Sequence, residues 1–287
     1  GLGDVYKRQA TGDQCSPLHI KIGQERDSLT CIFCDENALF VACVRELPYN
    51  GSRSREGRKR EGKPVMNQLL HEDAEKIVSA GIHAVLPDVA VIRALESYDF
   101  GTGGVYLVAA GKAAWQMAHA AVSCLSGHIR RGVVITKYGH SGGPLAGIAC
   151  FEGGHPIPDE GSCRGTRAAL ALVRDLGAQD TVVFLLSGGG SALLEEPLVP
   201  LSELQDITGQ LLACGADIVE INTIRKRLSA VKGGRFAQAC APARVLCIVL
   251  SDILGDPLDM IASGPAYPDS STCAQALEVV RKYGLRL

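Results

Sequence analysis

The sequence has almost no excess charge, no membrane-length apolar run and no secretory segment. Its 287 residues carry a formal net charge of -2, which gives no reason to expect binding to nucleic acid or to a membrane surface. The longest early apolar run, residues 38–44, is much shorter than the roughly 20 residues that a membrane-spanning helix needs. No hydrophobic secretory region opens the chain. The composition therefore indicates an ordinary globular protein.

A regular cysteine framework is also missing. The 11 cysteines are odd in number and irregularly spaced, which favours a reducing intracellular compartment over a disulfide-linked secreted fold. Cys31 and Cys34 form a CxxC, but a single pair lacks the further ligands of a zinc site. We therefore expect a cytoplasmic protein, with the mitochondrion as the alternative.

Residues 1–63 differ in pattern from the remainder of the chain. Residues 1–9 have the unpatterned composition of a non-native leader, and residues 51–63 are rich in Gly, Ser, Arg, Lys and Glu. That second stretch is typical of a solvated linker, with a nuclear-targeting patch as the alternative. We predict a poorly ordered leader and linker over 1–63 and one globular domain over 64–287.

From residue 64 onward, helical periodicity alternates with short, fully apolar runs. The clearest runs are residues 104–110, 181–186 and 244–250, which are typical of parallel strands buried on both faces. Because helical segments separate them, the sequence predicts an α/β fold, a mostly parallel sheet with helices on both faces. In such folds ligands bind where strands end and loops begin.

The strongest local pattern is a serine- and glycine-rich loop that follows the apolar run 181–186 directly. Its members are Ser187, Gly188, Gly189, Gly190 and Ser191. Glycine tolerates positive φ and lets a phosphate approach the backbone amides closely. A tight strand-to-helix turn is the alternative, but three consecutive glycines exceed what such a turn needs. We therefore predict an anion-binding loop.

Three well-known loop motifs are incomplete. A dinucleotide-binding fingerprint that begins at Gly188 has Leu193 in place of its third glycine. The same leucine breaks a hydrolase nucleophile elbow around Ser191. A Walker A loop ending at Lys112 is excluded because Tyr106 occupies the position of its first glycine. These absences argue against a dinucleotide-dependent enzyme, a serine hydrolase and a P-loop protein.

Lys112 lies where the apolar run 104–110 ends and a helical pattern begins. A helix dipole disfavours a cation at the helix N-terminus. A lysine in that position therefore suggests an anionic ligand that offsets the dipole. A lysine that simply points into solvent is the alternative.

Residues 152–162 form a second candidate loop, which two prolines make rigid. It carries His155, Asp159 and Glu160, and histidine can act as a base or a hydrogen-bond donor near neutral pH. Ser162 could equally serve only as the N-cap of the next helix. Structural and functional roles are both open for this loop.

A basic cluster lies near the end of a predicted helix, before a Gly-Gly pair. Its members are Arg225, Lys226, Arg227, Lys232 and Arg235. A helix C-terminus favours cations, so part of the cluster needs no function. Arg225, Ser229 and Lys232 could share one face. A clamp for a carboxylate or a phosphate is the functional interpretation.

Two aspartates complete the candidate site. Asp252 follows the apolar run 244–250, Asp256 lies four residues later, and a Ser-Gly-Pro turn follows at 263–265. Carboxylates at strand ends hold Mg²⁺ in many phosphoryl-transfer sites, whereas an Asx turn is the structural alternative. Together the glycine loop, the lysine, the basic cluster and the aspartates indicate phosphoryl transfer.

In this order, these segments resemble the class II glycerate kinase family, which has a Rossmann-like N-terminal domain and a C-terminal MOFRL domain. The matching segments are residues 111–113, 187–193, 222–234, 250–257 and 261–265. The resemblance starts near Met66 and reaches the end of the chain. It implies transfer of the γ-phosphoryl group of ATP to a hydroxyl of D-glycerate, with Mg²⁺ as cofactor.

The resemblance also implies roles for the candidate residues. Lys112 would act at the transferring phosphate, with Arg225 and Asp252 as further catalytic residues. The loop 187–191 and Lys232 would bind substrate or phosphate. His155 joins this group from the chemistry of its own loop and not from the resemblance. Asp252 and Asp256 would orient the metal ion; that last assignment comes from the chemistry of carboxylates.

The family's chain continues into a second domain, whereas this sequence stops at Leu287. The resemblance implies a site between the two domains, so we expect this fragment to be weakly active or inactive. Two alternatives remain: an NAD(P)H-dependent hydroxypyruvate reductase, which the incomplete fingerprint disfavours, and a non-catalytic domain that binds anionic metabolites. A homo-oligomer also stays open.

Overall fold

A computed structural model describes residues 30–33, 39–45, 64–251 and 257–287. Its sheet has the strand order β1-β2-β7-β6-β3-β4-β5. The strands are β1 (Thr30–Phe33), β2 (Leu39–Arg45), β3 (Val105–Ala110), β4 (Ile129–Lys137), β5 (Ile148–Gly153), β6 (Thr181–Leu186) and β7 (Arg244–Ser251). Only β1 pairs antiparallel, with β2, and every other pairing is parallel.

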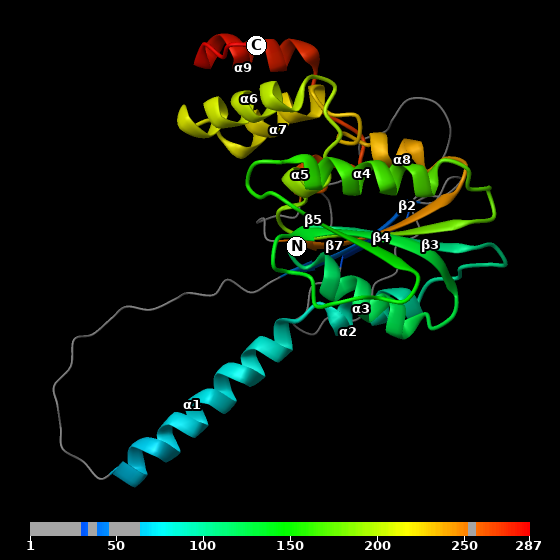
Figure 1. Ribbon diagram of the computed structural model, residues 1–287, viewed down its shortest axis with the longest axis vertical. Helices are drawn as coiled ribbons and strands as arrows, with labels where there is room; N and C mark the ends of the chain where they lie inside the picture. Colours follow the sequence, from blue (N-terminus) through cyan, green and yellow to red (C-terminus); the bar gives the residue numbers. More distant parts are fainter. Residues whose placement is uncertain (1–29, 34–38, 46–63, 252–256) are drawn as a thin grey trace, which may run out of the picture.

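Helices cover both faces of this sheet, as the sequence predicted (Figure 1). On one face lie α2 (Asp88–Glu96) and α3 (Ala114–Cys124), and on the other α4 (Glu160–Val173), α5 (Gly190–Leu193) and α8 (Arg235–Ala239). Neighbouring β3 residues enter opposite cores: Leu107 packs with α2 and α3, and Val108 packs with α4 and α8. Both faces of the central strands β3, β6 and β7 are buried, which explains why their sequences show no polar alternation.

A third layer lies beyond α4 and contains α6 (Leu201–Ala213), α7 (Ile218–Arg227) and α9 (Cys273–Tyr283) (Figure 1). Its core includes Ile207, Ile221 and Val279. The 3-10 helix η1 (Ile261–Ser263) contacts both α7 and α5. The 3-10 helix thus connects α7, which carries Arg225, with α5, the short helix that contains the end of the glycine loop.

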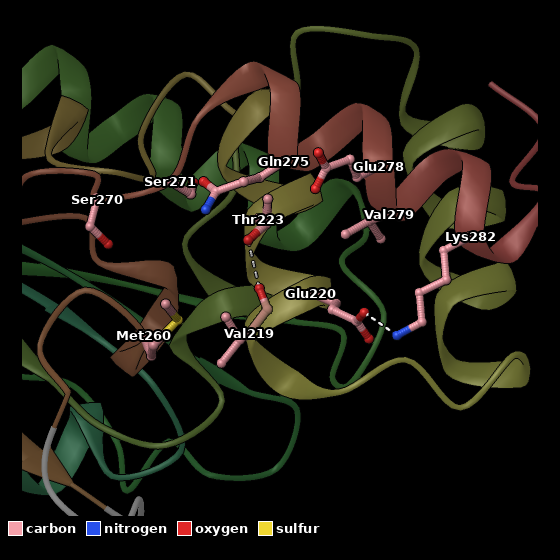
Figure 2. A pocket seen from close by; sticks show the side chains of 10 residues that line it. All are labelled: Val219, Glu220, Thr223, Met260, Ser270, Ser271, Gln275, Glu278, Val279 and Lys282. Atoms are coloured by element: carbon pink, nitrogen blue, oxygen red, sulfur yellow. Dashed lines mark hydrogen bonds and ion pairs between the residues drawn. The ribbon is translucent and has the colours of Figure 1, made fainter.

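A groove of about 370 Å³ lies between α7 and α9 (Figure 2). At one end the Lys282 ammonium donates to Glu220 at 2.6 Å, and the Tyr283 hydroxyl donates to the other oxygen at 2.6 Å. The hydrogen bond from Lys282, reinforced by that from Tyr283, lowers the pKa of Glu220 to about 2. Among the predicted site residues that the structure describes, none lines this groove.

The helix α1 (Pro64–Val85) confirms the predicted helical periodicity of this segment and extends away from the sheet (Figure 1). Several of its apolar side chains are more than half exposed: Leu69, Leu70, Ile77, Val78 and Ile82. Periodicity therefore predicted the helix but not the absence of a packing partner among the described residues. No described helix combines the length and the apolar character needed to cross a bilayer.

Two strands, β1 and β2, fall within residues 1–63, where we expected no element. The signal for β2 was the apolar run 38–44, which has the length of a strand and pairs in parallel with β7. The proposed boundary between leader and domain stays a prediction. Residues 1–9 and 51–63, on which the leader and linker predictions rest, lie outside the described part of the chain.

Candidate functional site

The glycine loop leaves the sheet at the carboxyl end of β6 and is tied to the end of β3. The Ser187 N–H donates to the Ala110 carbonyl at 3.0 Å, and the Lys112 N–H donates to the Gly188 carbonyl at 2.9 Å. Gly189 has φ +87°, a conformation that side chains disfavour. The adjacent ends of two central strands thus build the loop, because parallel strands end at the same edge of the sheet.

Backbone donors of this loop remain available. The N–H groups of Gly190 and Ala192 donate to carbonyl groups within the loop. Those of Gly188, Gly189 and Ser191 have no acceptor among the described residues. Successive free amides at a turn of this kind suit an anion.

Lys112 and His155 flank the loop at Gly189. A Cβ atom built on Gly189 would lie 3.2 Å from Lys112 Cγ and 2.9 Å from His155 Cδ2. Any larger residue at this position would push against both side chains. The tertiary structure therefore brings together three residues from three segments that the sequence analysis singled out separately.

The backbone of Lys112 is fixed while its side chain is exposed. The Thr136 hydroxyl donates to the Gly111 carbonyl at 3.1 Å, and His140 Nδ1 lies 3.2 Å from the Lys112 carbonyl. No carboxylate among the described residues pairs with the Lys112 ammonium. Thr136 and His140, which the sequence analysis missed, therefore position this lysine through its backbone.

The loop that carries His155 ends in a helix cap. Asp159 is the N-cap of α4 and accepts a hydrogen bond from the Ser162 N–H at 3.1 Å. The sequence analysis offered Ser162 as a possible N-cap, but Ser162 lies in the first turn of α4. Burial raises the pKa of Asp159, but hydrogen bonds from the backbone and from Tyr138 outweigh it and keep the pKa below its usual value. Asp159 thus has a structural role.

Most of the basic cluster is neutralised inside the protein. The buried Lys226 ammonium lies 3.3 Å from Asp269 and 3.6 Å from Asp259, and Arg227 pairs with Asp269 at 2.8 Å. Arg235 donates to three backbone carbonyls near the end of α7. Helix capping and ion pairing explain these three cations.

We predicted that Lys232 contacts the substrate, but the structure places its ammonium in a buried ion pair. Lys232 is fully buried, and its ammonium lies 2.8 Å from Glu195 and donates to the Leu194 carbonyl at 2.8 Å. Burial lowers the pKa of Lys232, and Glu195 opposes that shift. The sequence analysis missed this pair, because nothing in the local pattern showed that Glu195 would be buried. We therefore interpret Lys232 as a structural residue.

Arg225 is the member of the cluster whose guanidinium has no hydrogen-bond or ion-pair partner among the described residues. It is partly exposed on α7. Burial lowers the pKa of Arg225, and the charge of Glu195 partly offsets this. It therefore remains available for an anionic ligand.

Hydrogen bonds connect the glycine loop to α7. Ser191 Oγ lies 3.0 Å from Ser263 Oγ, and Ser263 donates to Asn222 Oδ1 at 2.8 Å. Ser263 and the preceding Ala262 have φ values of +62° and +51°, an uncommon conformation for residues with side chains that is often found at functional sites. Asn222 lies one turn before Arg225 on α7, so Arg225 is carried by a helix that Ser263 of η1 connects to the loop.

A family model described as a domain of unknown function, DUF4147, matches residues 73–287. The chain belongs to this family. The DUF4147 chain is 56% identical over 220 residues to the D-glycerate 2-kinase of Thermotoga maritima, which covers 76% of this chain and 52% of that protein. A crystal structure of glycerate kinase from Thermotoga maritima shares 54% identity with a TM-score of 0.69, over 77% of this chain and 53% of that one. The resemblance and the predicted α/β fold are thus confirmed.

A third DUF4147 relative carries a different name. A protein of Agrobacterium vitis, provisionally named a hydroxypyruvate reductase, is 39% identical over 214 residues, or 74% of this chain and 48% of its own length. The DUF4147 chain spans about half the length of these curated relatives.

The two aspartates of the predicted metal site, Asp252 and Asp256, lie outside the described residues. Within the described part of the DUF4147 chain, no group of three or more His, Cys, Asp or Glu side chains could hold a metal ion. Mg²⁺ is commonly held by only one or two carboxylates together with phosphate groups of the substrate. The metal site therefore stays a prediction.

Gly189 offers a test of this geometry in the DUF4147 chain. We expect Gly189→Ala to lower the free energy of unfolding by about 1–2 kcal/mol, because alanine is strained in the left-handed region. The matched control is Gly209→Ala in α6, where nothing lies within 4 Å of the new methyl group. That control should raise stability by about 0.5–1 kcal/mol. Urea unfolding of both variants measures the difference, and equal effects would contradict the loop conformation.

Proposed function

We propose that this chain forms part of a site that transfers the γ-phosphoryl group of ATP to a hydroxyl of D-glycerate. The observation that carries the proposal is the arrangement at Gly189. There, loop amides without acceptors among the described residues lie beside an exposed lysine that has no counter-ion among them. The names of relatives at 56% and 54% identity support the same reaction.

The chemistry of phosphoryl transfer suits such an arrangement. The hydroxyl oxygen of glycerate attacks the γ-phosphorus, the bond between this phosphorus and the oxygen of the ADP leaving group breaks, and the hydroxyl proton is released. Catalysis then depends mainly on positioning and on stabilising negative charge. In this proposal Lys112 stabilises the transferring group, the loop amides hold a phosphate or carboxylate, and Arg225 adds a second cation.

Magnesium would supply further charge neutralisation, with Asp252 and Asp256 as its proposed carboxylate ligands. Kinase chemistry supports this assignment. The roles of Lys112, Arg225 and the loop amides do not depend on it.

The test uses a chimera, because the chain spans about half the length of its relatives. Residues 73–287 of this chain would replace the matching half of the Thermotoga maritima D-glycerate 2-kinase. We expect D-glycerate-dependent release of ADP from ATP in a coupled assay. We also expect the 287-residue chain by itself to be much slower, since only part of the proposed site is then present. A folded chimera without ADP release would overturn the proposal.

Two further arms of this assay test the alternatives. The name of the Agrobacterium vitis relative favours a hydroxypyruvate reductase, which would oxidise NADH or NADPH in the presence of hydroxypyruvate. A non-catalytic binding domain would show stabilisation by phosphate or D-glycerate in thermal unfolding but no transfer in the chimera. We expect no oxidation of reduced nicotinamide, because the dinucleotide fingerprint is incomplete at Leu193.

A further inference from the structure

The hydrogen bonds behind the glycine loop have a direction that can be inferred from the partners of Asn222. Asn222 and Ser263 are fully buried, and Ser191 is partly exposed at the loop. The three side chains come from α7, η1 and α5. Two hydrogen bonds connect them in series, from Asn222 on α7 through Ser263 to Ser191 in the loop. We call these three residues the serine–asparagine relay.

Asn222 sets the direction of this relay. Its side-chain nitrogen donates to the Met260 carbonyl at 3.0 Å, and only the NH₂ group of an amide can make that bond. The amide oxygen Oδ1 therefore faces Ser263, and an amide oxygen only accepts hydrogen bonds. A hydroxyl group has a single proton, and Ser263 donates it to Asn222 Oδ1.

The bond between the two serines must then be donated by Ser191. The hydroxyls lie 3.0 Å apart, and Ser263 has no second proton to give. Ser191 therefore directs its only proton inward, to Ser263. Toward the ligand side it offers lone pairs alone.

This direction gives Ser191 a different role from its neighbours in the loop. Phosphate and carboxylate oxygens need donors, which the free amides of Gly188 and Gly189 provide. An oxygen that only accepts would repel such groups and instead bind a hydroxyl proton. We propose that Ser191 is a fixed acceptor that recognises a hydroxyl group of the substrate, and that Ser263 and Asn222 are positioning residues for it. The substrate class is thus a hydroxylated carboxylic acid, which deepens the proposed function and depends on it.

The direction itself can be tested on the 287-residue chain by neutron crystallography after exchange into D₂O. We expect the deuterium of Ser263 to point at Asn222 and that of Ser191 to point at Ser263. A deuterium on Ser263 that points at Ser191 would overturn the proposal, whatever the chain catalyses.

The recognition can be tested with three acids that differ by one hydroxyl. Saturation-transfer NMR on the 287-residue chain would measure binding of D-glycerate, of D-lactate, which lacks the 3-hydroxyl, and of 3-hydroxypropanoate, which lacks the 2-hydroxyl. We expect Ser191→Ala to weaken the binding of D-glycerate about three- to tenfold, which corresponds to the loss of one hydrogen bond. The acid that lacks the recognised hydroxyl should bind equally to both proteins. Ser202→Ala, on the exposed start of α6, is the matched control and should change nothing.

Ser263→Ala is a further variant. Ser191 keeps its hydroxyl group in this variant but no longer has Ser263 as the acceptor for its proton. We expect the preference for D-glycerate over the deoxy acid to fall, because Ser191 can then donate as well as accept. Equal weakening of all three acids by Ser191→Ala, or no binding of D-glycerate to the wild-type chain, would overturn the proposal. A chain that discriminates as expected but yields an inactive chimera would instead overturn only the kinase reaction.

Discussion

Replacement of Lys112 by Met is expected to lower the turnover number of the chimeric kinase by about 10³–10⁵-fold, the loss seen when a cation at a transferring phosphoryl group is removed. The physical reason is that Lys112 lies beside the glycine loop with its ammonium exposed and without a carboxylate partner among the described residues. Its charge is then available to the phosphoryl group. Steady-state measurement of kcat and KM with D-glycerate and ATP gives the loss.

Two controls make this result specific. Lys76→Met removes an exposed lysine of α1 that pairs with Asp73 at 3.4 Å, so its kcat should match that of the unmodified chimera. Lys112→Arg keeps the charge and should retain more activity than Lys112→Met, although the ammonium position changes. A loss under about threefold in Lys112→Met would remove this lysine from the site, since transition-state cations contribute far more.

Lys232→Met is expected to destabilise the protein by about 3–5 kcal/mol, because breaking a buried ion pair leaves a charge without compensation. Lys232 and Glu195 are both buried at 2.8 Å from each other. One Glu195 oxygen already lacks a hydrogen-bond partner among the described residues, so the carboxylate depends on the lysine. The free energy of unfolding in urea measures the effect.

The double variant Glu195→Gln with Lys232→Met separates structure from ligand binding. With both charges absent, most of the lost stability should return, because replacing a whole buried pair often costs little. If Lys232→Met instead left stability within about 1 kcal/mol but weakened binding of phosphate, the lysine would have the ligand role expected from the sequence and not the structural one.

The basic cluster shows why a local pattern did not separate these roles. Five cations lie within residues 225–235, and helix-end electrostatics allowed each of them a structural or a functional role. The partners that decide between the two come from distant segments: Glu195 for Lys232, and Asp259 and Asp269 for Lys226. Arg225 is left as the candidate cation because no described partner pairs with it.

The relay behind Ser191 shows the same limit. Asn222 and Ser263 lie in two separate segments of the sequence analysis, 222–234 and 261–265, and nothing in either segment predicted a contact with Ser191. Hydrogen bonds of 3.0 and 2.8 Å across three elements connect them. Those bonds are the basis for proposing that Ser191 accepts a hydrogen bond from the substrate and does not contact its anionic group.

The sequence alone determined the parallel α/β architecture, because strands buried on both faces must be apolar throughout and helices must alternate with them. It also identified the glycine loop, since free amides and positive φ require glycine there. Only the tertiary structure decided which cations are neutralised, that Lys112 and His155 both lie beside Gly189, and that Asn222 and Ser263 are hydrogen-bonded behind Ser191. Those properties depend on burial and on contacts between residues far apart in the chain, which no local pattern encodes.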